Sequence, residues 1–416
     1  MAFHTYKIEK FGKTTDGSYS DEATLVDNIV SASVNLAAGE NADGFSFTQF
    51  NDGGNDFEDL AIDDRVKIYG SLDGTTFTLL IDGMVNQKQQ SGDTNGDFIT
   101  ITGLNRLEKL FNALVSTTGE SAQHTASYWV KNLIDQVNEF NKLGGTNREI
   151  KYNSTTIVDT TDTISFVKGF ERAFKLIEEL SKPEYTGGLN YVYYMDNNNY
   201  FYFTPRSDVE AGVLTYGDSV ISHRTTKGMF DIVNYIIMNA GKSPYGMSIL
   251  QFDYNADSIR KFGWKVKLVN EGISSAMGTD EIRLMRMRNV YAEDSLFPNA
   301  YDYTTSWGTT TSSDSEYNSD YVDEALVRAK DRIRILLNKN GGASYKVDLV
   351  MMPSFGYGLY NTHTLIIPAN GKNTYYNWDY GVKLRIETVH YSFSEQGWKT
   401  DLGMKQDSDK SEGGSI

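Results

Sequence analysis

The stretch VKLRIETVHYSFSEQGWKTDLGMK, from Val382 to Lys405, decides how the end of this chain folds. Apolar residues alternate with polar ones along it, but the alternation slips by one residue at Glu387-Thr388. Alternation with a period of two predicts a β-strand with one buried face, and a one-residue slip predicts a β-bulge. With a turn at Glu395–Gly397, the stretch is predicted to be a bulged hairpin.

The two faces of this hairpin differ in chemistry. The face expected to be buried carries Leu384, Ile386, Val389, Tyr391, Phe393, Trp398 and Leu402. The opposite face carries Lys383, Arg385, Lys399 and Asp401. We therefore expect one face to pack on the protein or a neighbour, and the other to meet water.

The composition of the whole chain favours β-structure. Aromatic residues make up 13% of the 416 residues, and 37 glycines stand beside only 6 prolines, which favours sheets joined by glycine turns. At about 150 residues per domain, the length predicts about three domains. Residues 406–416 have no apolar periodicity and are expected to form a flexible tail.

The charge and the missing cysteine restrict the function. With 39 basic and 55 acidic side chains, the formal net charge is −16, which disfavours binding to duplex phosphates but not an acidic surface past which nucleic acid slides. Without cysteine there is no disulfide or thiolate chemistry. The N-terminus lacks the apolar region of a signal peptide, and no apolar run reaches the ~20 residues of a membrane span. We expect a soluble protein that folds in a cytoplasm.

The first half of the chain divides into a β block and a helical unit. Alternating strands run to Thr102, with Asn95-Gly96 as a hairpin turn, and a short helical pattern follows at Leu104, Leu107, Leu110, Phe111 and Leu114. Two amphipathic helices then end at Gly144-Gly145 and at Pro183. Their buried residues are expected to be Val130, Leu133, Ile134 and Val137 in the first helix, and Phe166, Phe170, Ala173, Phe174, Ile177 and Leu180 in the second. An aromatic hairpin, Leu189–Arg206, completes the unit.

Strand patterns resume near Val213 and include YKVDLVMMP before the closing hairpin. Between them, the polar stretch Thr304–Asn318 is expected to be a long surface loop. A third helix should bury Val322, Leu326, Ala329, Ile333 and Leu336 and end at Gly341-Gly342. A weak echo links 81–85 (IDGMV) with 386–389 (IETV), because each follows a Leu-containing strand and precedes a hairpin turn. Whether this reflects duplication stays open at this point.

Motifs for metal, phosphate or cofactor chemistry are incomplete. Gly12–Thr15 lacks the first glycine of a phosphate loop, and Asp93–Asp97 lacks the glycine and glutamate of a calcium loop, so both are interpreted as turns. The histidines, which show no zinc-ligand spacing, are His4, His124, His223, His363 and His390. His390 is interpreted as a surface residue on the polar face of its strand.

Two groups of residues are candidates for catalysis or for carbohydrate binding. Asp56-Phe57-Glu58-Asp59 and Asp63-Asp64 could supply paired carboxylates for glycoside hydrolysis, although acidic loops are common in so acidic a chain. The aromatic strands YVYYM and YFYF could form a carbohydrate platform, but aromatic cross-strand pairs also stabilise ordinary sheets, and a core or interface role is favoured. We therefore assign no catalytic, cofactor-binding or metal-binding residue, and expect no enzyme activity and no cofactor.

The order of these segments resembles the late-control-D or baseplate-hub family of phage tails and contractile injection machines. The resemblance is carried by the helices TASYWVKNLI and FERAFKLIEELSK, the hairpin ending YFYFTPR, the segment DSIRKFG, the helix ALVRAKDRIRILLNK, and the closing VHYSFSEQGWKTDLGMK. It covers residues 20 to 405 as a series of degenerate patterns. The loop at 304–318 is longer than is typical, and a lysozyme-like or peptidase-like extension is missing, so cell-wall cleavage is not expected.

The resemblance implies an α+β, β-rich fold, with two tube-type antiparallel β-barrel domains and small α/β insertion domains. The implied divisions are a first barrel at 1–118, an insertion of two helices and a hairpin at 119–206, strands of the second barrel at 207–270, a loop-rich helical insertion at 271–343, closing strands at 344–405, and a tail at 406–416.

The resemblance also implies a function. Such a protein is a structural hub whose homotrimer forms a pseudo-six-fold ring, joins the hexameric tail tube to the tip or spike complex, and lines the DNA-ejection channel. The implied partners are a tail tube or distal tail protein, a tip, spike or fibre protein, and a tape measure protein, in a virion assembled in the host cytoplasm. DNA would pass without specific binding, along a wall that the net charge suggests is acidic. The alternatives are a tail-associated glycan- or peptidoglycan-degrading enzyme and a receptor-binding adhesin.

Overall fold

The computed structural model describes residues 5–39, 42–51, 59–94, 96–118, 123–145, 147–182, 185–187, 189–207, 210–228, 232–242, 248–270, 329–330, 332–334, 336–337, 344–367, 383–394 and 397–406. Several expectations lie outside these residues, namely the loop at 304–318, the tail at 407–416, His4, Asp56, Glu58, Pro183, Val322, Leu326 and the turn residues Glu395 and Gln396. The implied insertion at 271–343 lies mostly outside them as well.

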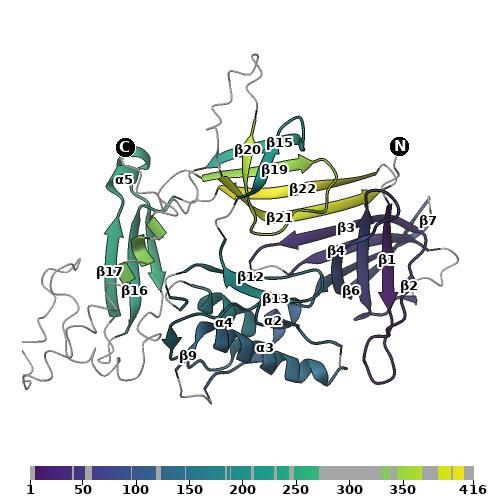
Figure 1. Cartoon of the computed structure of the whole chain (residues 1–416), viewed down its shortest axis with the longest axis horizontal. Helices are drawn as coiled ribbons and strands as arrows, with labels where there is room; N and C mark the ends of the chain where they lie inside the picture. The colour runs from purple at the N-terminus through teal and green to yellow at the C-terminus, as the bar shows by residue number, and fades with distance from the viewer. Residues whose placement is uncertain are drawn as a thin grey trace, which may run out of the picture.

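A 13-stranded sheet dominates the structure and confirms the expected β-rich, largely antiparallel fold. Its main path runs β15 (Val220–Gly228), β19 (Ser344–Met351), β22 (Gly397–Gln406), β21 (Lys383–Ser394), β3 (Ile29–Ala37), β4 (Gly44–Phe50), β7 (Gly96–Asn105), β6 (Thr78–Asp93), β5 (Arg65–Ser71), β1 (Thr5–Phe11) and β2 (Thr24–Leu25). β20 (Thr362–Ile366) pairs with β21, and β14 (Glu210–Thr215) pairs parallel to β20. The N-terminal and C-terminal strand regions meet at the ladder between β3 and β21 (Figure 1).

This arrangement differs from two separate barrels. No pairing between the described strands closes the sheet on itself, and strands of both regions belong to one continuous sheet. The reason lies in β21, whose first residues pair with β20 while Thr388–Ser394 pair with β3.

The two parts of this sheet repeat one topology. In the N-terminal part the spatial order is β3-β4-β7-β6-β5, and in the C-terminal part it is β15-β19-β22-β21-β20. Both orders use their strands in the same succession along the chain, and all corresponding neighbours are antiparallel. β3 thus corresponds to β15, and β6 to β21.

The bulges of the two parts coincide as well. Asn86 is the extra residue in the β6–β7 ladder, and Glu387 is the extra residue in the β21–β22 ladder. From each bulge the ladders run equally far, to the closing pairs Asp93↔Gly96 and Ser394↔Gly397. The β3–β4 and β15–β19 ladders also carry matching bulges, at 30 and 221.

The sequence therefore identified the right strands for an internal echo but in the wrong alignment. The bulges align Val85, rather than Ile81, with Ile386. Residue-type similarity misplaced the echo because the two hairpins share geometry and length more than side chains. The β-bulge predicted at Glu387-Thr388 is confirmed. The predicted hairpin of β6 and β7 is also present, but Gly96 already belongs to β7 and pairs with Asp93, and Asn95 lies outside the described residues.

One apolar core lies under both parts of the large sheet. It includes Val34 and Phe47 from the first part and Val347 and Leu349 from the second, each at most 1% exposed. The predicted buried face of the closing hairpin is confirmed, since all seven of its apolar residues are at most 8% exposed. Alternation with period two thus sends apolar side chains to one side and polar side chains to the other.

A helical unit with its own core packs beneath the sheet (Figure 1). It holds α2 (Glu108–Asn112), α3 (Ala126–Lys142), α4 (Ala173–Leu180), the hairpin β12 (Tyr191–Met195) and β13 (Phe201–Pro205), and the short pairs β8 (Leu114–Val115) with β11 (Glu171–Arg172) and β9 (His124–Thr125) with β10 (Thr163–Ile164). The predicted buried stripe of α3 is confirmed, and the side chain of Thr125 caps the helix by accepting a hydrogen bond from the Tyr128 amide at 3.3 Å.

Three helix predictions are corrected. Phe170 is 80% exposed rather than buried, because Glu171-Arg172 pairs with β8 in extended form and α4 begins only at Ala173. Leu104 belongs to strand β7, and Leu114 is 61% exposed. In the third helix, Ala329 and Ile333 are buried as expected, but Leu336 is only partly buried and Leu337 is buried instead.

A separate sheet holds strands that had been expected in the second barrel. β16 (Tyr235–Lys242) pairs with β17 (Ser248–Tyr254) and with β18 (Val266–Asn270), beside α5 (Ala256–Phe262). Of the strands in 207–270, only β14 and β15 join the large sheet. Alternation marks a strand but does not say which sheet it joins, so the sequence could not separate them. Among the described helices, none is long and apolar enough to cross a membrane.

Candidate functional site

The polar face of the large sheet is the best candidate for a functional surface. One row of residues runs across five neighbouring strands, and its members are Ser392, Ser33, Ser46, Thr102 and Gln87. A parallel row consists of Ser394, Ser31, Thr48, Thr100 and Gln89, in which the Thr48 and Thr100 hydroxyls lie 3.3 Å apart. Both rows cross from the C-terminal part into the N-terminal part, and both are neutral.

Charged residues border these rows in the C-terminal part. The predicted polar residues Lys383, Arg385, Lys399 and Asp401 lie opposite the buried face of the hairpin, as expected. The charged residues on this side of β15, β19, β21 and β22 beyond Lys383 are Arg224, Lys346, Arg385, Lys399, Lys405, Asp348, Glu387 and Asp401. Lys399 forms an ion pair with Asp401 at 3.0 Å. Basic and acidic groups are thus mixed, and the net charge of −16 is not concentrated on the described part of this face.

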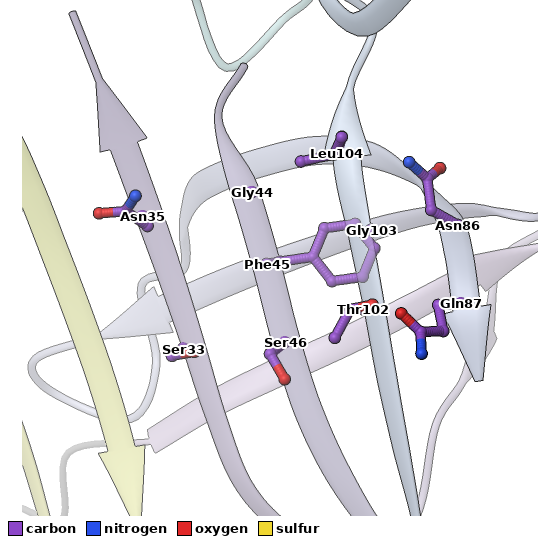
Figure 2. A pocket seen from close by; sticks show the side chains of 10 residues that line it. All are labelled: Ser33, Asn35, Gly44, Phe45, Ser46, Asn86, Gln87, Thr102, Gly103 and Leu104. Atoms are coloured by element: carbon purple, nitrogen blue, oxygen red, sulfur yellow. The ribbon is translucent and has the colours of Figure 1, made fainter. Parts of the chain in front are cut away.

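A shallow hollow of about 490 Å³ lies on this face where β3, β4, β7 and β6 run side by side (Figure 2). Figure 2 shows Ser33, Ser46, Thr102 and Gln87 in line across these strands. The hollow reaches down to Phe45, whose ring occupies space that side chains at Gly83 and Gly103 would fill. Glycine on these neighbouring strands therefore leaves room for the Phe45 ring on the buried side of the sheet.

A buried carboxyl group supports the end of the same strands. Asp43 accepts a hydrogen bond from the Ala37 amide at 2.9 Å and another from the side-chain amide of Asn105 at 2.6 Å. Burial raises the pKa of Asp43 to about 7, although the Ala37 hydrogen bond acts in the opposite direction. Since Asn105 also accepts from the Leu107 amide at 3.1 Å, this group ties the β3–β4 turn to the start of the helical unit.

The acidic residues considered for catalysis have structural roles wherever they fall within the described part of the chain. Asp63 binds Lys13 at 3.0 Å and Arg148 at 2.8 Å, and Tyr19 donates to it at 3.3 Å. Burial acts to raise the pKa of Asp63, but Lys13 and Arg148 outweigh it and hold the pKa below its usual value. Asp64 accepts from the Ala61 amide at 2.8 Å within a turn. These contacts join the N-terminal strands to the helical unit.

The histidines do not come together. His124 stacks on Tyr128 with ring centroids 3.8 Å apart, and His223 meets Tyr216 edge to face. His363 is buried beside Tyr357. His390 lies on the polar face between Asn35 and Asp401, where partial burial lowers its pKa. Within the described ranges, no three His, Asp or Glu side chains are grouped as metal ligands would be.

The aromatic hairpin mostly builds the core of the helical unit. Tyr191, Tyr193, Phe201 and Phe203 are at most 7% exposed. On the other side of the hairpin, Tyr194 and Tyr202 stack with centroids 4.8 Å apart, and Tyr194 also contacts Tyr360 of the large-sheet region. The Tyr360 hydroxyl donates to the Tyr193 carbonyl at 3.3 Å. The core or interface interpretation is therefore confirmed.

Sequence reasoning missed the hydroxyl rows, although a signal was present. In the segments NIVSASVNL and GFSFTQF, serine and threonine alternate with the buried apolar residues. The pattern showed that each strand has a polar face. It did not show that these faces meet, because the register between β21 and β3 joins distant segments.

At the level of sequence, no protein-family model matches the chain, and no curated protein matches it. At the level of structure, the fold is that of phage tail proteins. The chain is similar to the 43 kDa tail protein of prophage MuSo2 from Shewanella oneidensis, with a TM-score of 0.59, 12% identity, and coverage of 96% of this chain and 98% of that one. It is also similar to the tail protein from Neisseria meningitidis MC58, with a TM-score of 0.57, 8% identity, and 97% of each chain covered.

A third similar structure is prophage tail protein gp18 from Listeria monocytogenes EGD-e, with a TM-score of 0.50, 10% identity, and 96% and 94% coverage. The similarity extends over almost the whole length of all three proteins and so includes the insertions as well as the large sheet. At these identities it establishes a common fold. The resemblance drawn from the sequence is confirmed at that level.

Proposed function

We propose that this protein is a structural hub of a phage tail, in which three copies form a pseudo-six-fold ring between the hexameric tail tube and the tip or spike complex. The observation that carries the proposal is the repeat in the large sheet, whose two parts share strand order and bulge positions. A trimer with two similar units per chain presents six similar surfaces to a six-fold tube. We infer that each part acts as one tube-type barrel unit of the assembled ring.

The polar face is the proposed wall of the DNA channel. The rows through Ser33 and Ser31 carry hydroxyls and amides, which bind water and offer phosphates no fixed cation. The charged residues that border them are mixed in sign, six basic and three acidic with Lys383 counted, so the described part of this wall is not acidic as the net charge alone suggested. DNA would pass along a hydrated surface without specific binding.

The proposed partners follow from this place in the particle. On one side the ring contacts the tail tube or a distal tail protein, and on the other a tip, spike or fibre protein, with the tape measure protein inside. The protein would be assembled in the host cytoplasm and reside in the virion tail. We propose no catalytic turnover, because the described acidic candidates serve as ion-pair and turn residues.

Native mass spectrometry tests the proposal. The chain has a mass of 46.7 kDa, so we expect a trimer of about 140 kDa (three times 46.7 kDa) that also co-purifies with tail tube protein. A strict monomer under all conditions, including in the presence of tube protein, would overturn it. Release of soluble fragments from peptidoglycan by the purified chain would instead favour the enzyme.

A further inference from the structure

Several strand edges of the large sheet lack a ladder in the part of the chain that the structure describes, and two of them belong to β15 and to β6. β15 ends the main path and pairs with β19 on one side. β6 pairs with β5 only up to Met84, and from Gln87 to Asp93 its ladder is with β7 alone. Both edges consist of a backbone that can accept another strand.

The internal repeat indicates how such edges pair with another strand. β15 corresponds to β3, and the 87–93 segment of β6 corresponds to Thr388–Ser394 of β21. Within one chain, β3 and that part of β21 pair with each other in an antiparallel ladder. We propose that β15 of one copy pairs in the same way with the 87–93 segment of β6 in a second copy. The inference deepens the proposed ring and rests on it, by naming the edges through which the copies join.

The repeat also specifies the register. Ser392 lies opposite Ser33 in the junction within the chain. Ser392 corresponds to Ser91 by its distance from the bulge, and Ser33 corresponds to Arg224 because each faces the matching residue of the next strand. Ser91 of one copy therefore lies opposite Arg224 of the next. The same rule puts Gln89 opposite Thr226.

The chemistry of both edges suits joining through the backbone. Gln87, Gln89 and Ser91 on one edge, and Arg224 and Thr226 on the other, are all exposed. In the junction within the chain, Val389, Tyr391 and Phe393 of β21 are buried, whereas the residues of β6 that correspond to them are Lys88, Gln90 and Gly92. The segments 87–93 and 222–228 contain no apolar side chain. Such an edge resists indiscriminate aggregation and still offers its main-chain hydrogen bonds to a partner of matching shape.

The proposed register contains one unfavourable pair, and this pair provides a test that applies to this register alone. Lys88 would lie opposite Lys227, and like charges directly across a ladder are destabilising. Replacing Lys88 by glutamate should therefore strengthen association, by about two- to fivefold per interface. In any register that separates these lysines, the same substitution brings no such gain.

Cysteine pairs test the register, because the native chain has no cysteine. Residues directly opposite in a ladder have Cα atoms about 4.5–5.5 Å apart, within the range for a disulfide, whereas positions two residues apart are beyond it. The variant Ser91→Cys/Arg224→Cys should form disulfides between copies on mild oxidation. The pair Ser33→Cys/Ser392→Cys should give a disulfide within one chain, and Ser91→Cys/Thr226→Cys, which is two residues out of register, should give none.

On a non-reducing gel we expect covalent dimers and trimers from Ser91→Cys/Arg224→Cys, and monomers from both control pairs. A native trimer that does not cross-link through these residues would overturn the edge pairing and leave the ring standing. A ladder of bands beyond the trimer would support the edge pairing but show an open filament, and so overturn the closed ring. A strict monomer would overturn both.

Discussion

Gly103 shows how a single missing side chain makes room for packing beneath the large sheet. A Cβ atom at this position would overlap the Met84 carbonyl oxygen and the ring of Phe45. A Cβ at Gly83 would also meet Phe45, at 2.8 Å. The two glycines together let the Phe45 ring lie close under the sheet, on its buried side.

We expect Gly103→Ala to lower the free energy of unfolding by about 1–3 kcal/mol, because the new methyl group overpacks a filled site. Denaturant unfolding of the purified variant measures this loss. Gly12→Ala is the matched control, since a Cβ at Gly12 meets nothing within 4 Å. Equal stability of the two variants would contradict the packing described for Phe45.

Asp43 predicts a particular pH dependence. Its folded-state pKa of about 7 lies above the ordinary 3.8, so between these values the folded protein holds a proton that the unfolded chain releases. The stability contributed by this group is therefore full below about pH 4 and is lost as the pH rises towards 7, by at most about 1.4 kcal/mol per pH unit. Unfolding curves between pH 5 and 8 measure it. Asp43→Asn should flatten that slope, and an unchanged slope would refute the assignment.

The bulge at Glu387 is the feature on which strand β21 depends. Leu384 and Ile386 before it, and Val389, Tyr391 and Phe393 after it, reach the same core only because one extra residue restores the phase. A slip of one residue turns a whole set of side chains to the other face of a sheet. The matching bulge at Asn86 follows the buried residues of β6, and the residues described after it are polar or glycine.

Deleting Glu387 should therefore abolish folding of the large sheet, with a loss of more than about 4 kcal/mol. Circular dichroism and soluble yield report this outcome. Glu387→Ala keeps the residue count and removes only the ion pair with Arg385 at 3.4 Å, so it should cost less than about 1 kcal/mol. A folded, soluble deletion variant would show that the bulge does not set the phase.

For the assembled molecule, the neutral rows predict how DNA behaves at the channel wall. Ser33→Arg/Thr102→Arg would place cations in the row that crosses the junction, and contacts with phosphates give salt-dependent binding. We expect the variant trimer to retain duplex DNA at low salt and release it at high salt, whereas the wild-type trimer and Ser33→Asn/Thr102→Asn do not retain it. Gel-shift titration measures retention. Salt-dependent binding by the wild type would contradict the proposal that DNA passes this wall without being bound.

The fold could be predicted from the sequence where the pattern is local, and could not be predicted where it depends on residues far apart in the chain. Alternation around Glu387 located the bulge, and apolar spacing around Val130 and Leu133 located α3, because both patterns are local. Phe170 was misassigned since the pairing of Glu171-Arg172 with β8 is a contact over a long sequence distance.

The same limit applied to the site. The hydroxyls of Ser31 and Ser33 were visible as a polar face, but the pairing of β3 with β21 leaves no local trace in either segment. Nor could the pattern of β16 tell that it joins a separate sheet. The fold class was therefore predictable from the sequence, while the juxtaposition that forms the polar rows required the structure.

The ladder between β3 and β21 can form only late in the synthesis of the chain. Val34 and its strand emerge from the ribosome roughly 350 residues before their partner Tyr391, a delay of about 20 to 70 s at usual rates of translation. During that time the strand β3, which carries apolar residues, has no β21 with which to pair. We therefore expect nascent chains to engage holding chaperones until the closing hairpin is made, and truncated chains ending before Val382 to aggregate.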